Sequence, residues 1–163
     1  MPLGDTYLEL IAVVDPDEAA GSAFGRWVVA AEEGRPLGWA VRTQQLDVIA
    51  GRLGLAVTAG SRRRKDGRVL RWRLAGMEQA MPDPALPFFI EWGDGTLLPG
   101  RAEVEHRDGP LRIDEVRLAG GADRLENWLG AHHLPITVRA GTPAVTGVVL
   151  AGASVSIAIP GAD

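Results

Sequence analysis

Pro36-Leu-Gly-Trp-Ala-Val-Arg-Thr43 opens the most strongly patterned part of the sequence, and Pro87-Phe-Phe-Ile-Glu-Trp92 closes it. Both segments are rich in the β-branched and aromatic residues that favour strands. Between them lie an amphipathic helical pattern and a hairpin turn at Lys65-Asp66-Gly67, where Asp-Gly supplies the positive φ angles of a tight turn. We therefore expect strands at 38–43, 55–64, 68–75 and 88–92, a helix at 45–53 and a loop at 77–86.

A shorter version of the same order follows a glycine- and proline-rich linker at residues 93–101. The patterns predict strands at 111–118, 136–139, 145–150 and 154–159, and a helix at 123–129. Each half thus has the order strand, helix, strand, strand, strand. Two copies of one supersecondary unit favour an assembly with approximate twofold symmetry, in which each unit covers the open side of the other.

The N-terminal part combines a strand pattern with a short helix. Residues 5–14 are rich in apolar and β-branched types, with the carboxylate of Glu9 in their middle, and they predict an additional strand. Asp15-Pro16-Asp17-Glu18 is typical of a helix start, because an aspartate caps the helix and acidic residues favour the positive end of its dipole. Glycines interrupt the helical pattern, so we expect a short connector helix that begins near Ser22 and packs on the outside.

The composition of the 163 residues indicates one α+β domain, with the N-terminal strand and connector at 1–35 and the two units at 36–93 and 103–161. Hydrophobic residues make up 46% of the chain, and the absence of cysteine excludes disulfides and thiolate metal sites. No segment is typical of a signal peptide or reaches the roughly 18 apolar residues of a membrane span. Arginine far outnumbers lysine, as in GC-rich genomes, so we expect a bacterial protein. Without a signal-peptide or membrane-span pattern, we expect it in the cytoplasm, with no membrane contact.

Arg62-Arg-Arg-Lys65 is a basic run at the expected hairpin. It could contact the phosphates of a nucleic acid, or it could be a solvated tip that keeps a sheet edge from aggregating. The net charge of −4 and the lack of an aromatic residue within the run favour the solvated tip. We therefore expect no nucleic-acid partner.

Four segments resemble the glyoxalase-like branch of the vicinal oxygen chelate superfamily, which includes glyoxalase I, extradiol dioxygenases and bleomycin-resistance proteins. They are Gly4-Asp-Thr-Tyr-Leu-Glu-Leu-Ile11, Gly38-Trp-Ala-Val-Arg-Thr43, Asp66-Gly-Arg-Val-Leu-Arg-Trp-Arg-Leu74 and Pro87-Phe-Phe-Ile-Glu-Trp92. The resemblance implies two tandem βαβββ units that form one curved mixed sheet. Because the first segment normally closes a preceding unit in that branch, the resemblance also implies a chain shortened at its N-terminus.

The resemblance further implies a divalent metal ion on the concave side of the sheet, bound by a histidine or glutamine from the first strand of a unit and a glutamate from the last. By position, Glu91 and Glu9 occupy the last-strand place and Glu115 the first-strand place, whereas Gly38 and Ser156 replace two expected ligands. Carboxylates without histidine favour magnesium or manganese over zinc, nickel or iron. Glu91 is the candidate catalytic residue.

Strand alternation predicts which other side chains share the concave side. If the three glutamates point inward, their neighbours on that side are Tyr7, Arg42, Arg71, Arg73, Phe89, Arg117 and Ser156. Arginines bind carboxylates and phosphates in bidentate fashion, so a small acidic or aromatic ligand would fit. Alternatively, these arginines and glutamates pair with each other across the sheet. The histidines at 106, 132 and 133 are expected at the surface.

Three functions are consistent with these features. The first is a small-molecule-binding protein with a degenerate metal site. The second is a divalent-metal-dependent lyase, isomerase or dioxygenase that uses Glu9, Glu91 and Glu115. The third is a non-catalytic dimerisation or interaction domain, in which the N-terminal strand pairs with a second copy of the chain to form a homodimer.

Overall fold

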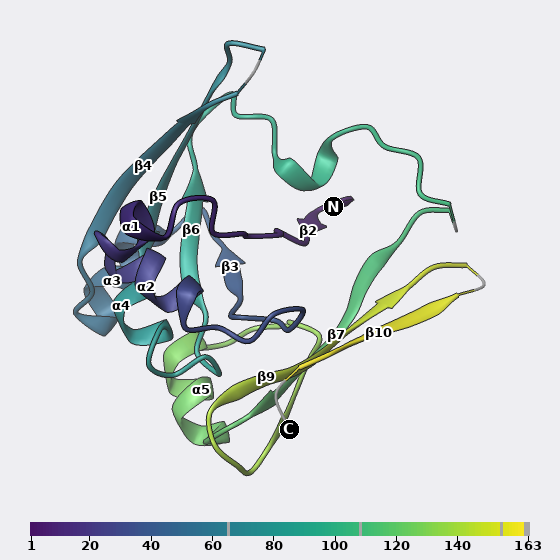
Figure 1. Ribbon diagram of the computed structural model, residues 1–163. Helices are drawn as coiled ribbons and strands as arrows, with labels where there is room; N and C mark the ends of the chain where they lie inside the picture. Colours follow the sequence, from purple (N-terminus) through teal and green to yellow (C-terminus); the bar gives the residue numbers. More distant parts are fainter. Residues whose placement is uncertain (65, 108, 154, 162–163) are drawn as a thin grey trace.

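The computed structural model describes residues 1–64, 66–107, 109–153 and 155–161. Its main elements follow the order βαβββ twice, as Figure 1 shows. The expected α+β fold with two tandem units is therefore confirmed. Two positions used in the predictions lie outside the described residues: Lys65 of the hairpin turn and basic run, and Ser154 at the expected start of the last strand.

The first unit consists of β3 (Ala40–Arg42), α3 (Leu46–Leu53), β4 (Val57–Arg63), β5 (Val69–Ala75), α4 (Met77–Ala80) and β6 (Phe88–Trp92). It forms a four-stranded mixed sheet in the order β3-β6-β5-β4, in which only β3 and β6 are parallel. The short helix α4 lies in the segment expected to be a loop. It forms because Gly76 turns the chain at a φ of 85° and its carbonyl then accepts a hydrogen bond from the N–H of Ala80.

The second unit consists of β7 (Arg112–Ala119), α5 (Ala122–Leu129), β8 (Ile136–Arg139), β9 (Ala144–Ala151) and β10 (Ser156–Pro160). Its sheet has the order β10-β9-β7-β8, so its first strand pairs with its second and third strands rather than with its fourth. The units thus form two separate sheets with different strand orders, not one sheet with two alike halves. β9 buries Val145 and residues 147–150, so side chains on both of its faces are covered. Such burial is typical of a strand in the middle of a sheet, and β9 lies between β10 and β7.

The N-terminal strand prediction is wrong for most of its length. Only β2 (Thr6–Tyr7) is a strand, and it pairs with β1 (Pro2–Leu3) in a small hairpin. Leu8 exchanges hydrogen bonds with Met1 and so continues the hairpin by one residue. None of the described strands pairs with residues 9–14, and the exposed fractions of Leu10 and Val14 are 92% and 95%. An apolar, β-branched segment favours a strand only where neighbours accept its hydrogen bonds and cover its side chains.

The connector consists of two short helices rather than one, α1 (Pro16–Ala20) and α2 (Ala23–Val29). The side chain of Asp15 accepts hydrogen bonds at the start of α1, and that of Ser22 does so at the start of α2, so both predicted helix starts are confirmed. A 3₁₀ turn, η1 (Pro99–Arg101), lies in the linker. No helix within the described residues is long and apolar enough to cross a membrane.

Helices α3 and α5 meet where the two units join. α3 buries Leu46 against Phe89 of the first sheet, and α5 buries Leu125 in the core of the second unit. Trp128 of α5 packs against both cores. The guanidinium of Arg52 in α3 donates hydrogen bonds to carbonyls in the last turn of α5, where the negative end of the helix dipole favours a cation.

Candidate ligand-binding site

The register of the first sheet determines which side chains share a face. Arg73 pairs with Glu91, and Ala75 pairs with Phe89 two positions away on the same strands. Directly opposed residues project to the same side of a sheet, and Phe89 is buried against α3. Arg71, Arg73, Glu91 and Phe89 therefore all lie on the α3 side of the sheet.

A pocket of about 720 Å³ lies on this side, and we call it the arginine pocket. Three neighbouring strands form its floor, and β4 contributes small residues, with Ala59 opposite Arg73 and Ser61 opposite Arg71. Because these side chains are short, the space above the sheet stays open beside the arginines. The pocket is lined by residues 59–61, 71–73 and 91–94 together with Gln44.

Two carboxylates hold Arg73 at this pocket. Its Nε and Nη2 lie 2.9 and 2.6 Å from Oε2 of Glu91, and Nη2 also lies 2.9 Å from Oδ2 of Asp47 in α3. The hydrogen bond to Asp47, followed by that to Glu91, raises the pKa of Arg73 above its ordinary value. This guanidinium is thus used within the protein and connects the sheet to α3.

Arg71 is placed differently, because its exposed guanidinium has no hydrogen-bond or ion-pair partner among the residues that the structure describes. The backbone N–H of Gly93 donates to the carbonyl of Arg71 over 2.8 Å. A Cβ at Gly93 would lie 3.2 Å from the Cβ of Arg71, so the glycine leaves the space beside Arg71 open. Ser61 and Asp94 line the same pocket, and the described part of the chain offers no partner to either side chain.

The aromatic residues lie on the opposite face of the sheet. Trp72 pairs with Trp92 at a ring separation of 5.7 Å, and the ring of Tyr7 lies 6.5 Å from that of Trp92. The indole of Trp72 covers Gly60, where a Cβ would approach the ring to 2.5 Å. Burial, followed by the charge of Glu9, raises the pKa of Tyr7 to about 12. The prediction that Tyr7 shares a face with Arg71 and Arg73 is therefore wrong.

Phe89 and Arg42 also lie outside the pocket. Phe89 is 1% exposed and stacks on Trp128 at 6.0 Å, so it belongs to the core. Arg42 pairs with Ile90, the neighbour of Phe89, and so projects to the opposite face from Glu91. Of the residues predicted to bind a ligand, the pocket unites Arg71 and Arg73 with the candidate catalytic residue Glu91.

On the second sheet, Glu115, Arg117 and Thr137 form a polar cluster of their own. The Nε of Arg117 and the hydroxyl of Thr137 each donate a hydrogen bond of 2.8 Å to the carboxylate of Glu115. The bond from Thr137, followed by that from Arg117, lowers the pKa of Glu115. Ser156 lies exposed at the start of the edge strand β10. Neither Arg117 nor Ser156 lines the arginine pocket.

The three glutamates of the implied metal site do not converge. Glu91 lies on the α3 side of the first sheet, Glu115 lies on the second sheet, and Glu9 follows β2 in the exposed N-terminal segment. Within the described ranges, no three His, Cys, Asp or Glu side chains lie close enough together to hold a metal ion. Since arginines already pair with Glu91 and Glu115, these residues do not fit a shared metal.

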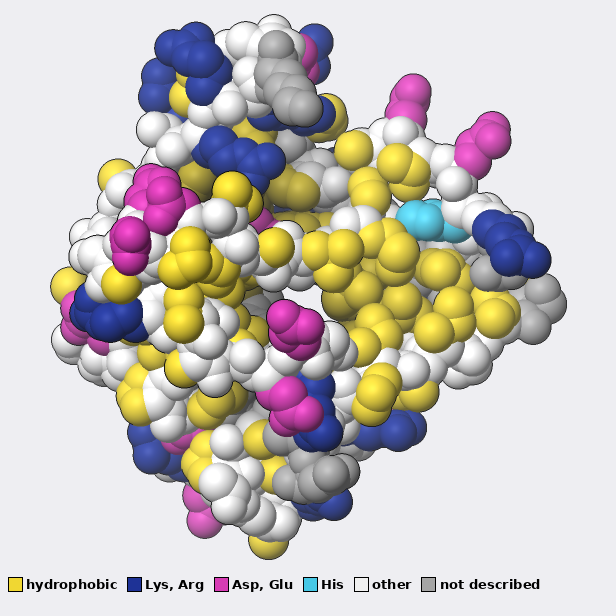
Figure 2. Space-filling model, viewed as in Figure 1, with side chains coloured by type: hydrophobic (Ala, Val, Ile, Leu, Met, Phe, Trp, Pro, Cys, Tyr) yellow, Lys and Arg dark blue, Asp and Glu magenta, His cyan; other side chains and the backbone are white. Residues whose placement is uncertain are grey.

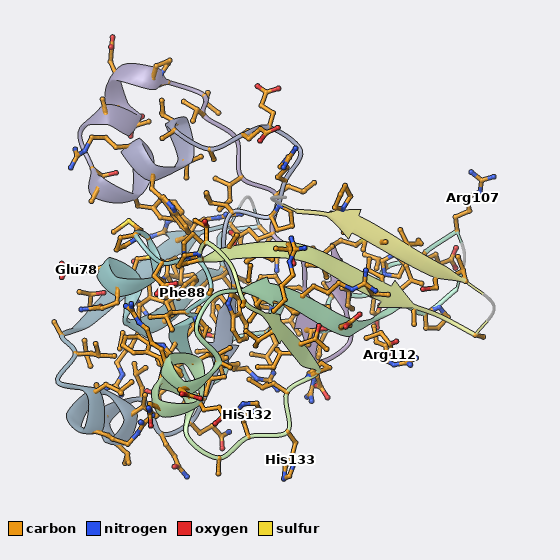
Figure 3. All side chains as sticks on the ribbon, turned by 90° about the horizontal axis from the view of Figure 1, so that it is seen from below. Glu78, Phe88, Arg107, Arg112, His132 and His133 are labelled. Atoms are coloured by element: carbon orange, nitrogen blue, oxygen red, sulfur yellow. The ribbon has the colours of Figure 1, made fainter. Side chains whose placement is uncertain are left out.

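The histidines occupy loop positions. His132 and His133 follow α5, and His133 points away from the sheets in Figure 3. The Nδ1 of His132 accepts a hydrogen bond from the N–H of Leu134 over 3.2 Å. The Nε2 of His106 donates to the carbonyl of Pro2 over 2.7 Å. The surface prediction is confirmed for His133, whereas the other two histidines are half-buried.

A second pocket, of about 530 Å³, lies between the N-terminal hairpin and residues 100–106 and 109–111. Leu3, Val104 and Leu111 are among its apolar lining residues, and Figure 2 shows hydrophobic side chains gathered over the region where Figure 1 draws β2, β7 and β10. Its arginine, Arg101, is paired with Asp5 over 2.6 Å. The arginine pocket therefore offers the better-placed charged groups for a ligand.

Comparison with known families identifies the fold. The family described as a glyoxalase-like domain matches residues 1–133. The chain belongs to the glyoxalase-like domain family. This confirms the resemblance of the four sequence segments to a glyoxalase-like domain of the vicinal oxygen chelate superfamily. The match ends before β8, so the last three strands of this glyoxalase-like domain protein lie beyond it. No curated protein and no solved structure matches the chain significantly.

Sequence reasoning missed several polar residues of the site. Ser61 could have been found, because the register of the Asp-Gly hairpin places it opposite Arg71. Asp47 lies in the first turn of α3, and Gln44 and Asp94 lie in loops. No periodicity indicates where the side chain of a loop residue points, so Gln44 and Asp94 had no comparable signal. The contact of Asp47 with Arg73 depends on how α3 packs on the sheet.

Proposed function

We propose that this glyoxalase-like domain protein binds a small acidic molecule in the arginine pocket. Arg71 carries the proposal, because its exposed guanidinium lines a pocket of about 720 Å³ and has no partner in the described structure. Guanidinium presents a planar fork of donors that matches a carboxylate or a phosphate. Ser61 stands opposite Arg71, and its hydroxyl can donate to the same group.

The surroundings of Arg71 favour binding of an acidic rather than an aromatic molecule. Asp47 and Glu91 already hold the side chain of Arg73 in place. This side chain therefore loses less conformational entropy when a ligand binds. The rings of Trp72 and Trp92 project to the opposite face of the sheet, so they offer no stacking surface to the arginines. A pocket of this volume falls in the range typical of small-molecule sites.

The metal-dependent alternative is less well supported. Glu91 accepts a hydrogen bond from Nε of Arg73 and forms an ion pair with its Nη2, which suits a residue that positions the arginine. A shared metal would require Glu9 and Glu115 to reach Glu91 from separate parts of the fold. We therefore propose binding, without assigning a reaction.

The proposal can be tested with acetate, succinate and inorganic phosphate as probes, using backbone amide shifts in NMR titrations. Arg71→Ala should weaken binding about tenfold or more, because hydrogen bonds to charged groups are worth roughly 1.5–3 kcal/mol. Arg62→Ala is the matched control. Arg62 is also exposed on the same hairpin, but it follows Ser61 in β4 and so projects to the other face.

Two outcomes would contradict the proposal. Equal losses in the Arg71 and Arg62 variants would indicate attraction by general positive charge rather than a site. Wild-type protein that binds none of the three probes would remove the basis for an acidic ligand.

A second function, self-association into a homodimer, is favoured by the exposed segment at residues 9–14. Leu10 and Val14 are almost fully exposed, and the described strands leave the segment unpaired. Two such segments could pair antiparallel about a twofold axis, which would satisfy their backbone groups and cover their apolar side chains. Self-association and ligand binding involve different parts of the chain and can both occur.

Sedimentation velocity tests this second function. We expect a dimer for the wild type and a monomer for Leu10→Asp, since a carboxylate would have to be buried in the paired segment. Val48→Asp is the matched control, because Val48 is 67% exposed on α3, away from the segment. A monomeric wild type, or a control that dissociates equally, would contradict self-association through this segment.

A further inference from the structure

The charges at the arginine pocket do not match a simple anion. The charged side chains that line it are Arg71, Arg73, Glu91 and Asp94, and Asp47 joins them through Arg73. Two positive and three negative side chains give a net charge of −1. A ligand that carries only negative charge would be attracted by Arg71 but repelled by the remaining carboxylates.

The three carboxylates differ in how they are paired. Arg73 is shared between Glu91 and Asp47, and each of those carboxylates accepts a hydrogen bond from it. Asp94 is exposed and forms no hydrogen bond or ion pair with any other described residue. The pocket thus contains one guanidinium and one carboxylate whose charges the described protein leaves uncompensated, those of Arg71 and Asp94.

These two groups originate from neighbouring points of the backbone. Gly93 is bonded to Arg71 through its N–H, and Asp94 follows Gly93 directly. Gly93 has no side chain to separate them, and both residues line the same pocket. Because both side chains start from one end of the pocket, they favour a ligand whose own opposite charges lie close together, on the same or adjacent carbon atoms.

We infer that the ligand of the arginine pocket is a small zwitterion of the α- or β-amino acid type. Its carboxylate binds the guanidinium of Arg71 and the hydroxyl of Ser61, and its ammonium group binds the carboxylate of Asp94. This inference rests on the proposed function, because it names the chemical class of the acid that Arg71 binds. It predicts a preference that a purely anionic site would lack.

The test compares matched probes in NMR titrations of the wild-type protein. L-alanine, L-glutamate and L-phenylalanine each carry both charges, and propanoate, pentanedioate and 3-phenylpropanoate are the same acids without the ammonium group. We expect each amino acid to bind about fivefold more tightly than its partner, because an ion pair at a partly exposed site contributes up to about 1 kcal/mol. N-acetylation should remove the advantage, and 6-aminohexanoate should lack it because its charges lie far apart.

Substitutions separate this inference from the proposal on which it rests. Asp94→Asn should abolish the preference for amino acids while acids still bind, whereas Arg71→Ala should weaken both classes. Glu105→Gln is the matched control, because Glu105 is exposed and lines the other pocket.

Each outcome has one meaning. If acids bind but amino acids have no advantage, or if Asp94→Asn leaves the advantage unchanged, the zwitterion inference is wrong and the acidic-ligand proposal stands. If Asp94→Asn strengthens the binding of both classes, Asp94 only repels anions, and the inference is again wrong. If neither class binds the wild type, the proposed function itself fails.

Discussion

The two carboxylates that hold Arg73 should contribute unequally to the stability of the protein. Arg73 lies 2.6–2.9 Å from both Glu91 and Asp47. The side chain of Glu91 is 24% exposed, whereas that of Asp47 is 73% exposed. Because water and salt screen exposed charges, the two contacts should differ in energy although their distances are similar. Double-mutant cycles with Arg73→Met, Glu91→Gln and Asp47→Asn measure each coupling energy separately.

The magnitudes follow from exposure and geometry. The pair with Asp47 resembles a surface ion pair, so its coupling should be about 0.3 kcal/mol. The pair with Glu91 has two donor nitrogens on one oxygen of a less exposed carboxylate, which favours a coupling of about 1 kcal/mol. Both values are discounted for the exposure of Arg73 itself, which is 40%.

Urea unfolding provides the coupling energies, measured at about 0.1 M and about 1 M salt, where the Debye length falls from roughly 10 to 3 Å. We expect the Asp47 coupling to approach zero at high salt and the Glu91 coupling to retain most of its value. If the Asp47 coupling equals or exceeds that of Glu91, exposure does not determine these energies. If neither coupling is measurable, Asp47 and Glu91 do not hold the side chain of Arg73 in place at the pocket.

Three further predictions concern other parts of the fold. Tyr7 is the only tyrosine, so the near-UV absorbance of tyrosinate should titrate at a pH of about 12 in the folded protein and near 10 in urea. The free energy of unfolding should fall between these two pH values, because there only the unfolded chain ionises. A midpoint near 10 in the folded protein would refute the burial of Tyr7. Because the pKa of Glu115 is lowered in the folded protein, its ionised carboxylate should stabilise the fold above pH 4.5, and this stabilisation should be lost at lower pH. Thr137→Val should therefore reduce the rise in the free energy of unfolding between acid and pH 6, and an unchanged pH profile would argue against the hydrogen bond from Thr137. Leu46→Ala should lower the free energy of unfolding by about 2–5 kcal/mol, because Leu46 is 0% exposed. Val48→Ala on the same helix should change it by less than about 0.5 kcal/mol, and similar losses in the two variants would contradict the orientation of α3.

Local patterns in the sequence were sufficient to predict most elements. The strand at Phe88–Trp92, the helix that begins at Leu46 and the hairpin between β4 and β5 follow from spacing, turn chemistry and capping, which act over a few residues. The grouping of Arg71 and Arg73 with Glu91 also follows from alternation, and the pocket unites all three. These features were predictable because side-chain direction along one strand repeats every second residue.

The N-terminal segment shows where local pattern fails. Residues 8–14 have a strong strand composition, yet the structure pairs only Thr6–Tyr7 with another strand. A strand is completed by hydrogen bonds to a neighbour, and the segment's own residues do not supply that neighbour. The exposure of Leu10 and Val14 is therefore a property of the assembled fold.

The sequence by itself determined the order of the main strands and helices in the two units, the register of the β4–β5 hairpin and the family to which the chain belongs. Only the tertiary structure decided that Glu91 lies on the α3 side of its sheet and Tyr7 on the other, that Glu115 lies on a different sheet, and that Asp94 lies in the pocket of Arg71. Alternation indicates which residues share a face, but packing between distant segments decides what that face meets. The candidate site depends on that packing, because Asp47, Arg71 and Asp94 come from a helix, a strand and a loop that no short-range pattern connects.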